Sequence, residues 1–212
     1  MSQLLLNILV RALMVFTVFP VRQYARNRMA VKLGDDTPVL EGKLTLNPFA
    51  HMDLMGCIFM MLLGFGWGKS ASIDPRKFKT KNPRLAMIAV ALAGPAANLL
   101  LALILVFGVM IAGYAGINNA FVQIFASIAL LNIRLAVFLL LPVPGFDGWD
   151  ILMMFLPVKF IWRISRYIHY IPLIVILLVY AGPLGSFIDI ISSRIISLMT
   201  ELASAVLGVF FR

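Results

Sequence analysis

The sequence predicts an all-α polytopic membrane protein with about five or six hydrophobic helical segments and a small membrane-associated β-hairpin after the first. Of the 212 residues, 62% are hydrophobic and 13% are charged, and the mean hydropathy is +0.99. A soluble domain averages roughly 45–50% apolar and about 25% charged residues. Helices are the expected spanning form, because lipid provides no water for an open backbone.

The apolar runs follow one another with polar stretches between them. The first, residues 4–19, lacks a basic leader and a small-residue cleavage site, so we interpret it as a retained helix rather than a signal peptide. Residues 54–67 are short for a span and are expected to be re-entrant or interfacial. The other candidate spans are residues 85–114, 121–141, 171–191 and 195–211.

A hairpin is predicted for residues 37–48, TPVLEGKLTLNP, because apolar and polar side chains alternate around Glu41-Gly42. We expect a single domain, with residues 1–155 as its membrane core and residues 156–212 adding a basic loop and two hydrophobic helices. Cys57 is the only cysteine, which excludes an internal disulfide and a thiolate metal cluster.

The net charge of +9 is interpreted as a topological signal. Residues 69–84 carry six basic residues and one acidic residue, and residues 142–170 add Lys159, Arg163 and Arg166. These loops flank the spans 85–114 and 121–141, so both lie on one side, which the positive-inside rule makes cytoplasmic. The lipid bilayer is therefore the expected partner, and nucleic acid is not.

Polar side chains inside apolar membrane segments are candidates for function, because burying them in a bilayer is costly. The stretch RQYAR, residues 22–26, places two arginines four residues apart, on one face of a helix. The full set of such candidates is Arg22, Gln23, Arg26, Asn47, His51, Asp53, Asn98, Asn132, Arg134 and Asp147.

Four stretches, in this order and spacing, resemble the site-2 protease family of intramembrane zinc metalloproteases, in its compact bacterial branch. The resemblance covers roughly residues 1–155 and implies a protein of the bacterial plasma membrane. Its most specific parts are NPFAHMD and the Pro-x-Pro-x-x-Asp-Gly pattern. The stretches are KLGDDTPVLEGKLTLNPFAHMD (32–53), FGWGKSASIDPRKFKTKNPR (65–84), ALAGPAANLLLAL (91–103) and FLLLPVPGFDGWDIL (138–152).

The resemblance implies where a zinc site would lie. In the family, a helical His-Glu-x-x-His supplies two zinc ligands and a general base, and a distant Asp is the third ligand. That Asp matches Asp147, whereas the His-Glu-x-x-His motif falls on residues 22–26. Arg22 and Arg26 then stand at the His positions and Gln23 at the Glu position.

Two further positions of the family pattern can be placed. Leu139 stands where the family has an Asn, and Asn98 matches an Asn that lies near the substrate in the family. Asn98 is equally interpreted as an interhelical hydrogen-bonding residue.

These residue types predict that no zinc site of the family's kind forms. A guanidinium has only donors and stays protonated, so it offers no lone pair to a cation. The other histidines, His51 and His169, lie in different segments, and His51 with Asp53 is interpreted as a local cap or turn. We therefore expect no cofactor and no catalytic residues, with Asp147 as the only retained ligand.

Two interpretations of the arginines remain open. Arg22 or Arg26 could pair with Asp147 and replace the positive charge of the missing metal. Alternatively, Arg22, Arg26 and Arg28 could extend to the lipid headgroups at the end of the first helix.

The predicted function is a non-catalytic pseudoprotease that binds or regulates a membrane partner, such as a transmembrane helix or an extended peptide. The chain would be a homologue of a zinc metalloendopeptidase without its two His ligands and its general-base Glu. The alternative is an active intramembrane zinc metalloprotease that cleaves transmembrane substrates with an unorthodox metal site. A third interpretation, an anion channel or transporter, rests on the arginines alone and lacks a transporter-like internal repeat.

Overall fold

The structure is a computed structural model that describes residues 3–64, 66–117, 119–157, 159–160 and 171–209. These residues form helices, turns and loops, without any strand. Four helices are long and apolar enough to cross a membrane, at Asn7–Lys32, Pro83–Tyr114, Ala120–Leu139 and Pro183–Leu207. The loop arginines Arg163 and Arg166 and the second histidine, His169, lie outside the described residues.

The first span is longer than the apolar run predicted. Helix α1 (Gln3–Leu13) continues through a π-helical turn (Met14–Val18) into α2 (Phe19–Lys32). Pro20 does not end the helix, because the π-helical turn directly before it accommodates the backbone hydrogen bond that a proline cannot make. As a result, the RQYAR stretch lies inside a continuous helix rather than after one.

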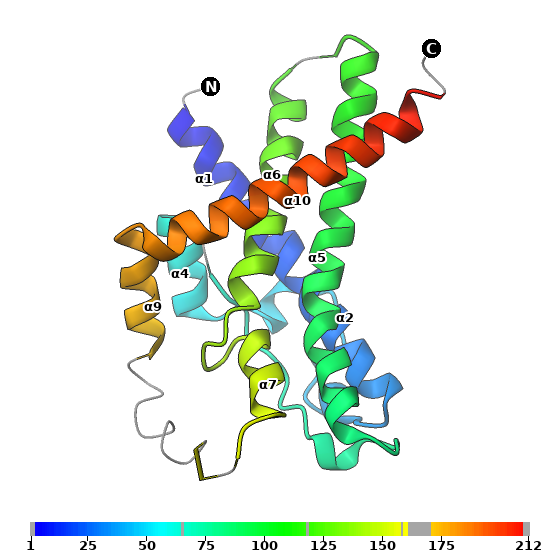
Figure 1. Cartoon of the computed structure of the whole chain (residues 1–212), viewed down its shortest axis with the longest axis vertical. Helices are drawn as coiled ribbons and strands as arrows, with labels where there is room; N and C mark the ends of the chain where they lie inside the picture. Colours follow the sequence, from blue (N-terminus) through cyan, green and yellow to red (C-terminus); the bar gives the residue numbers. More distant parts are fainter. Residues whose placement is uncertain (1–2, 65, 118, 158, 161–170, 210–212) are drawn as a thin grey trace.

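Helices α5 (Pro83–Tyr114) and α6 (Ala120–Leu139) form the centre of the bundle, and α2 packs against α5. Figure 1 shows the end of α2, the start of α5 and the short helix α7 at the same end of the molecule. Asn82 caps α5 through the Leu85 amide, and Asn119 caps α6.

The C-terminal part contains α9 (Ile171–Tyr180) and α10 (Pro183–Leu207), and α10 crosses α5 and α6 obliquely (Figure 1). The predicted break between residues 191 and 195 is wrong. The chain turns instead at Gly182, whose φ of 106° suits glycine, followed by Pro183 at the start of α10. Ser193 does not interrupt the helix, since its hydroxyl donates to the Ile190 carbonyl at 2.8 Å.

The prediction of a hairpin over residues 37–48 is also wrong. The chain forms α3 (Thr37–Leu40), a turn at Gly42 with φ 65°, and a 3₁₀ turn at Pro48–Ala50. The carboxylate of Asp35 accepts hydrogen bonds from the amide (3.0 Å) and the hydroxyl (2.5 Å) of Thr37. This capping and the helix-compatible φ of Pro38 outweigh the alternating pattern.

The short apolar segment after this loop forms α4 (Leu54–Leu63), only 10 residues long. Asp53 caps its start by accepting from the Gly56 amide at 2.8 Å, and Gly64 ends it in the left-handed conformation. A helix of this length rises about 15 Å, half the hydrocarbon thickness. As predicted, this segment is too short to span a bilayer.

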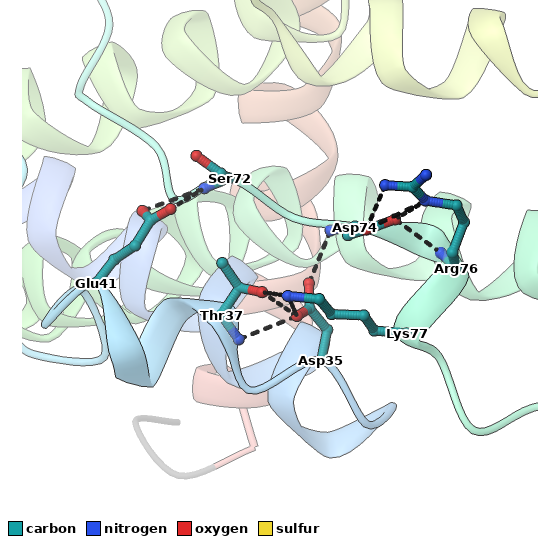
Figure 2. Close-up of polar contacts among 7 residues, drawn as sticks. All are labelled: Asp35, Thr37, Glu41, Ser72, Asp74, Arg76 and Lys77. Atoms are coloured by element: carbon teal, nitrogen blue, oxygen red, sulfur yellow. Dashed lines mark hydrogen bonds and ion pairs between the residues drawn. The ribbon is translucent and has the colours of Figure 1, made fainter.

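A polar network joins the loop after α2 to the loop before α5 (Figure 2). The buried carboxylate of Asp35 accepts from the Asp74 amide at 2.8 Å in addition to Thr37. Burial favours the neutral Asp35 carboxyl, but the hydrogen bonds from Thr37 and Asp74 outweigh it and lower the pKa of Asp35. Hydrogen bonds from the Arg76 guanidinium lower the pKa of Asp74 to about 2.

We predict that Asp35→Asn destabilises the chain in a pH-dependent way. With a lowered folded-state pKa, Asp35 stabilises the fold above its ordinary value of 3.8, and this contribution is lost as pH falls through the folded-state pKa. At neutral pH the variant should lose about 1.5–3 kcal/mol, and below pH 3.8 the difference from wild type should shrink. Thermal unfolding in detergent across pH measures this. Asp36→Asn, at an exposed neighbour without a side-chain cap, is the control, and equal effects of both variants would contradict the prediction.

Candidate functional site

The loop after α6 presents Asp147 at the first position of α7 (Asp147–Met153). Gly145 has φ 91°, a conformation that favours glycine. A Cβ on Gly148 would collide with the backbone carbonyl groups of Leu140 and Leu141. The glycine that follows Asp147 is therefore required for the close approach of α7 to the end of α6.

Asp147 faces the side of α2 that carries the two arginines. Arg22 Nη2 pairs with Asp147 Oδ2, and Arg26 Nη1 pairs with Asp147 Oδ1 at 2.6 Å. The exposed fraction is 0% for Asp147, 4% for Arg22 and 5% for Arg26. The described part of the chain thus brings the three residues together, and both carboxylate oxygens accept from a guanidinium.

A fourth charged residue joins them. Arg26 Nη2 pairs with Asp150 Oδ2 at 2.5 Å. Burial raises the pKa of the Asp150 carboxyl, and the Arg26 guanidinium opposes that increase. The sequence reasoning missed Asp150, although its position three residues after Asp147 on a helix could have indicated a shared face. The cluster of Arg22, Arg26, Asp147 and Asp150, hereafter the α2–α7 charge cluster, is formally neutral.

Gln23 is turned toward a different part of the chain. Its Nε2 donates to the Gly68 carbonyl at 3.1 Å and to Ser70 Oγ at 3.0 Å, and its side chain is fully buried. The Ser70 carbonyl in turn accepts from Lys43 Nζ at 2.6 Å, and the Lys69 amide donates to the His51 carbonyl at 2.7 Å. Gln23 therefore holds the segment 66–72 against α2.

Helix α5 closes the cluster from the other side. A Cβ at Gly94 would lie 3.2 Å from Cγ of Arg22, so the glycine makes room for this side chain. Asn98, one turn further on, is buried, and neither polar atom of its amide has a hydrogen-bond partner among the described residues.

Leu139, at the end of α6, is buried in the hydrophobic core.

The remaining polar candidates have local roles. Asn47 and Asp53 cap the 3₁₀ turn and α4, and His51 Nε2 lies 2.8 Å from the Thr45 carbonyl. The local interpretation of His51 and Asp53 is therefore confirmed. Asn132 donates to the Ile128 carbonyl at 2.8 Å within α6, and Arg134 pairs with Asp189 of α10.

Sequence comparison decides the family. The chain is 35% identical over 176 residues to "Putative zinc metalloprotease YwhC" of Bacillus subtilis (strain 168), a match that covers 80% of this chain and 79% of the relative. The chain belongs to the site-2 protease family.

A second relative agrees with this assignment. "Putative zinc metalloprotease Rip2" of Mycolicibacterium smegmatis (strain ATCC 700084 / mc(2)155) is 32% identical over 128 residues, which cover 58% of this chain and 48% of that protein. No family model and no solved structure matches the chain.

The residues of this site-2 protease family member do not fit a zinc ion at the α2–α7 charge cluster. Both oxygens of Asp147 already accept from guanidinium groups, which carry no lone pair for a metal. Among the residues that the structure describes, no three His, Cys, Asp or Glu side chains are grouped so as to hold a metal ion.

A hollow of about 310 Å³ opens beside the charge cluster of this family member. Arg26, Asp150 and Ser70 contribute its polar lining, and Ala71, Ile73, Met87, Met153 and Met154 are among its apolar lining residues. A mainly apolar wall with a few polar groups is typical of a binding pocket, and methionines adapt to varied partners.

Proposed function

We propose that this member of the site-2 protease family is not a protease and instead binds or regulates a membrane partner. The observation that carries this proposal is the double pairing of Asp147 with Arg22 and Arg26. The family resemblance aligns these three residues with the three zinc ligands. Guanidinium groups at the two His positions exclude the lone pairs that zinc requires.

The base position supports the same proposal. Gln23 aligns with the general-base Glu, and its amide is committed to Gly68 and Ser70. An amide does not accept a proton at neutral pH, so it provides no base for the activation of a water molecule. Two of the three ligands and the base of the family chemistry are thus replaced at the same site.

The arginines also explain how the fold tolerates the loss of a metal. A lone carboxylate at the position of Asp147, with an exposed fraction of 0%, would be costly. An unpaired arginine inside a bilayer costs about 2.5–3.5 kcal/mol on insertion scales. Pairing two arginines with two aspartates offsets both costs, so the charge cluster takes over the structural part of the metal's role.

A partner would be a transmembrane helix or an extended peptide of a membrane protein. The hollow of about 310 Å³ beside Arg26 and Asp150 suits an apolar side chain next to a polar group. Binding by strand addition to residues 37–48 is not proposed, because these residues form α3 and turns. The positive-inside rule supports loops 69–84 and 142–170 on the cytoplasmic side of a bacterial plasma membrane.

The second candidate is an active intramembrane zinc metalloprotease. Only the names of the two relatives favour it. It would need a ligand set other than the α2–α7 charge cluster, in which Asp147 has no free oxygen.

Cleavage of transmembrane peptides tests the choice between them. The full chain, reconstituted in lipid with a panel of labelled transmembrane peptides, is expected to give no product that depends on zinc, as measured by mass spectrometry. YwhC, assayed with the same panel, is the reference. If this chain forms product, and if a zinc chelator and Asp147→Ala both abolish it, the proposal is contradicted. The chain is then an active zinc metalloprotease.

A further inference from the structure

A second pair of arginines lies within the membrane spans, apart from the α2–α7 charge cluster. Arg11 of α1 and Arg134 of α6 line one hollow of about 230 Å³, together with Asn7, Ser127, Leu130 and Leu131. A second hollow, of about 410 Å³, shares Asn7 and Arg11 and reaches Met61 and Leu62 of α4. We call the two hollows together the α1–α6 groove.

Arg11 is held in place without a carboxylate. Its Nη1 donates to the carbonyl oxygens of Met61 at 2.7 Å and Leu62 at 2.8 Å. These carbonyls belong to the last turn of α4, the negative end of the helix dipole. Within the described part of the chain, no Asp or Glu pairs with Arg11, so its charge is only partly compensated.

Arg134 has a counter-ion that is itself exposed. Its Nη2 lies 2.9 Å from Asp189 Oδ1, and the Asp189 side chain is 53% exposed. The Nε of Arg134 is buried and has no hydrogen-bond partner in the described part of the chain. Around the α1–α6 groove, two positive charges therefore face one negative charge.

Both arginines of the groove belong to helices that are long and apolar enough to cross a membrane. Arg134 lies 14 residues after the start of α6 at Ala120 and 5 residues before its end at Leu139, about 21 Å and about 8 Å along the axis. Lipid phosphate groups lie outside a hydrocarbon core about 30 Å thick, so a headgroup would have to move into the hydrocarbon core to reach Arg134. The carboxylate of an acidic residue in a neighbouring helix can be placed at this depth.

We propose that the α1–α6 groove receives a transmembrane helix that carries one Asp or Glu side chain, and that its carboxylate pairs with Arg11. The inference rests on the proposed function, because it names the partner that a non-catalytic chain would hold. Pairing removes the cost of an uncompensated charge on both helices. The apolar side chains of Ile8 and Leu62 line the groove, are exposed and offer packing for such a helix.

The test uses the full chain and a designed peptide in discs of phosphatidylcholine. The peptide is a polyleucine transmembrane helix with a central Glu, and its matched control has Gln at that position. Energy transfer between labelled peptide and protein, at one peptide per disc, measures binding. The Glu peptide is expected to bind at least about tenfold more tightly than the Gln peptide, equivalent to about 1.4 kcal/mol.

Protein variants locate the site. Arg11→Gln should abolish the preference for the Glu peptide, whereas Arg28→Gln, at an exposed position of α2 outside the groove, should retain it. If Arg11→Gln does not fold, Arg11→Lys serves in its place. This variant keeps the charge and should retain a part of the preference for the Glu peptide. The comparison of the two peptides on the wild-type chain needs no variant.

Three outcomes would overturn the inference. Equal affinity for the Glu and Gln peptides would show that the carboxylate is not recognised. Absence of binding by both peptides would show that the groove does not receive a transmembrane helix. Loss of co-purified phosphatidylglycerol in Arg11→Gln, with no preference between the peptides, would assign the groove to a lipid phosphate. None of these outcomes alters the expected result of the cleavage assay, so failure of this inference is distinguishable from failure of the proposed function.

Discussion

Asp147→Ala is expected to destabilise the folded chain more than any other single replacement of an aspartate. The substitution leaves Arg22 without its carboxylate partner and leaves Arg26 with Asp150 alone. Both arginines are at least nine-tenths buried, so water cannot replace the lost partner. Removing one member of a buried ion pair typically costs about 3–5 kcal/mol. Thermal unfolding in detergent should therefore show a large decrease in the transition midpoint.

The matched control is Asp36→Ala, an exposed aspartate without a side-chain cap bond. A double-mutant cycle adds Arg22→Met to Asp147→Ala, and we expect the double variant to be more stable than the sum of the single effects predicts. Equal midpoints for Asp147→Ala and Asp36→Ala, or strictly additive effects in the cycle, would mean that the charge cluster does not hold α7 against α2.

The triple variant Arg22→His, Gln23→Glu, Arg26→His is expected to gain a zinc site. Residues 22 and 26 both reach the carboxylate of Asp147 from one face of α2. Two imidazoles at these positions and the freed Asp147 oxygens supply three protein ligands, the number found in catalytic zinc sites. Zinc per chain, measured by plasma mass spectrometry after purification, should rise to about one.

Binding should also stabilise the triple variant, since zinc binds the folded chain in preference to the unfolded chain. Added zinc is expected to raise its unfolding midpoint and to leave that of the wild type unchanged. The control is the same triple variant with Asp147→Ala, which should bind far less zinc. A folded triple variant that takes up no zinc would show that α2 and α7 no longer hold the geometry of a metal site.

Much of the architecture could be predicted from the sequence, because the bilayer imposes length and composition on each span. The apolar run before RQYAR and the runs at 85–114 and 121–141 each correspond to a long helix. The C-terminal division was wrong, because Ser192 and Ser193, between the two predicted spans, both lie within α10. A hydroxyl side chain in a helix can donate a hydrogen bond to a backbone carbonyl of the preceding turn, so polarity alone does not end a membrane helix.

The predicted hairpin failed for a local reason. Alternation over residues 37–48 describes side-chain polarity, but the backbone follows the hydrogen bonds from Thr37 to Asp35. Asp35 also binds the Asp74 amide, a contact 39 positions away that no short pattern reveals. Capping residues close to a proline should therefore weigh more than a short alternating pattern.

At the site, the chemistry of residues 22–26 could be predicted because a guanidinium and an amide have fixed donor and acceptor properties. The part played by Asp150 and the clamp between Gln23 and Ser70 depend on tertiary packing. The spacing of three residues indicates that Asp150 shares a helix face with Asp147, but its pairing with Arg26 is known only from the folded chain. The two arginines of the α1–α6 groove lie 123 positions apart and meet only in the folded chain.

The central claim is that arginines have replaced the metal at the α2–α7 charge cluster. Zinc content of the wild-type protein, purified in detergent without chelators, tests this claim most directly. We expect well below one zinc per chain, unchanged in Asp147→Ala. Zinc close to one per chain, lost on Asp147→Ala, would contradict the account and identify this family member as a zinc protein.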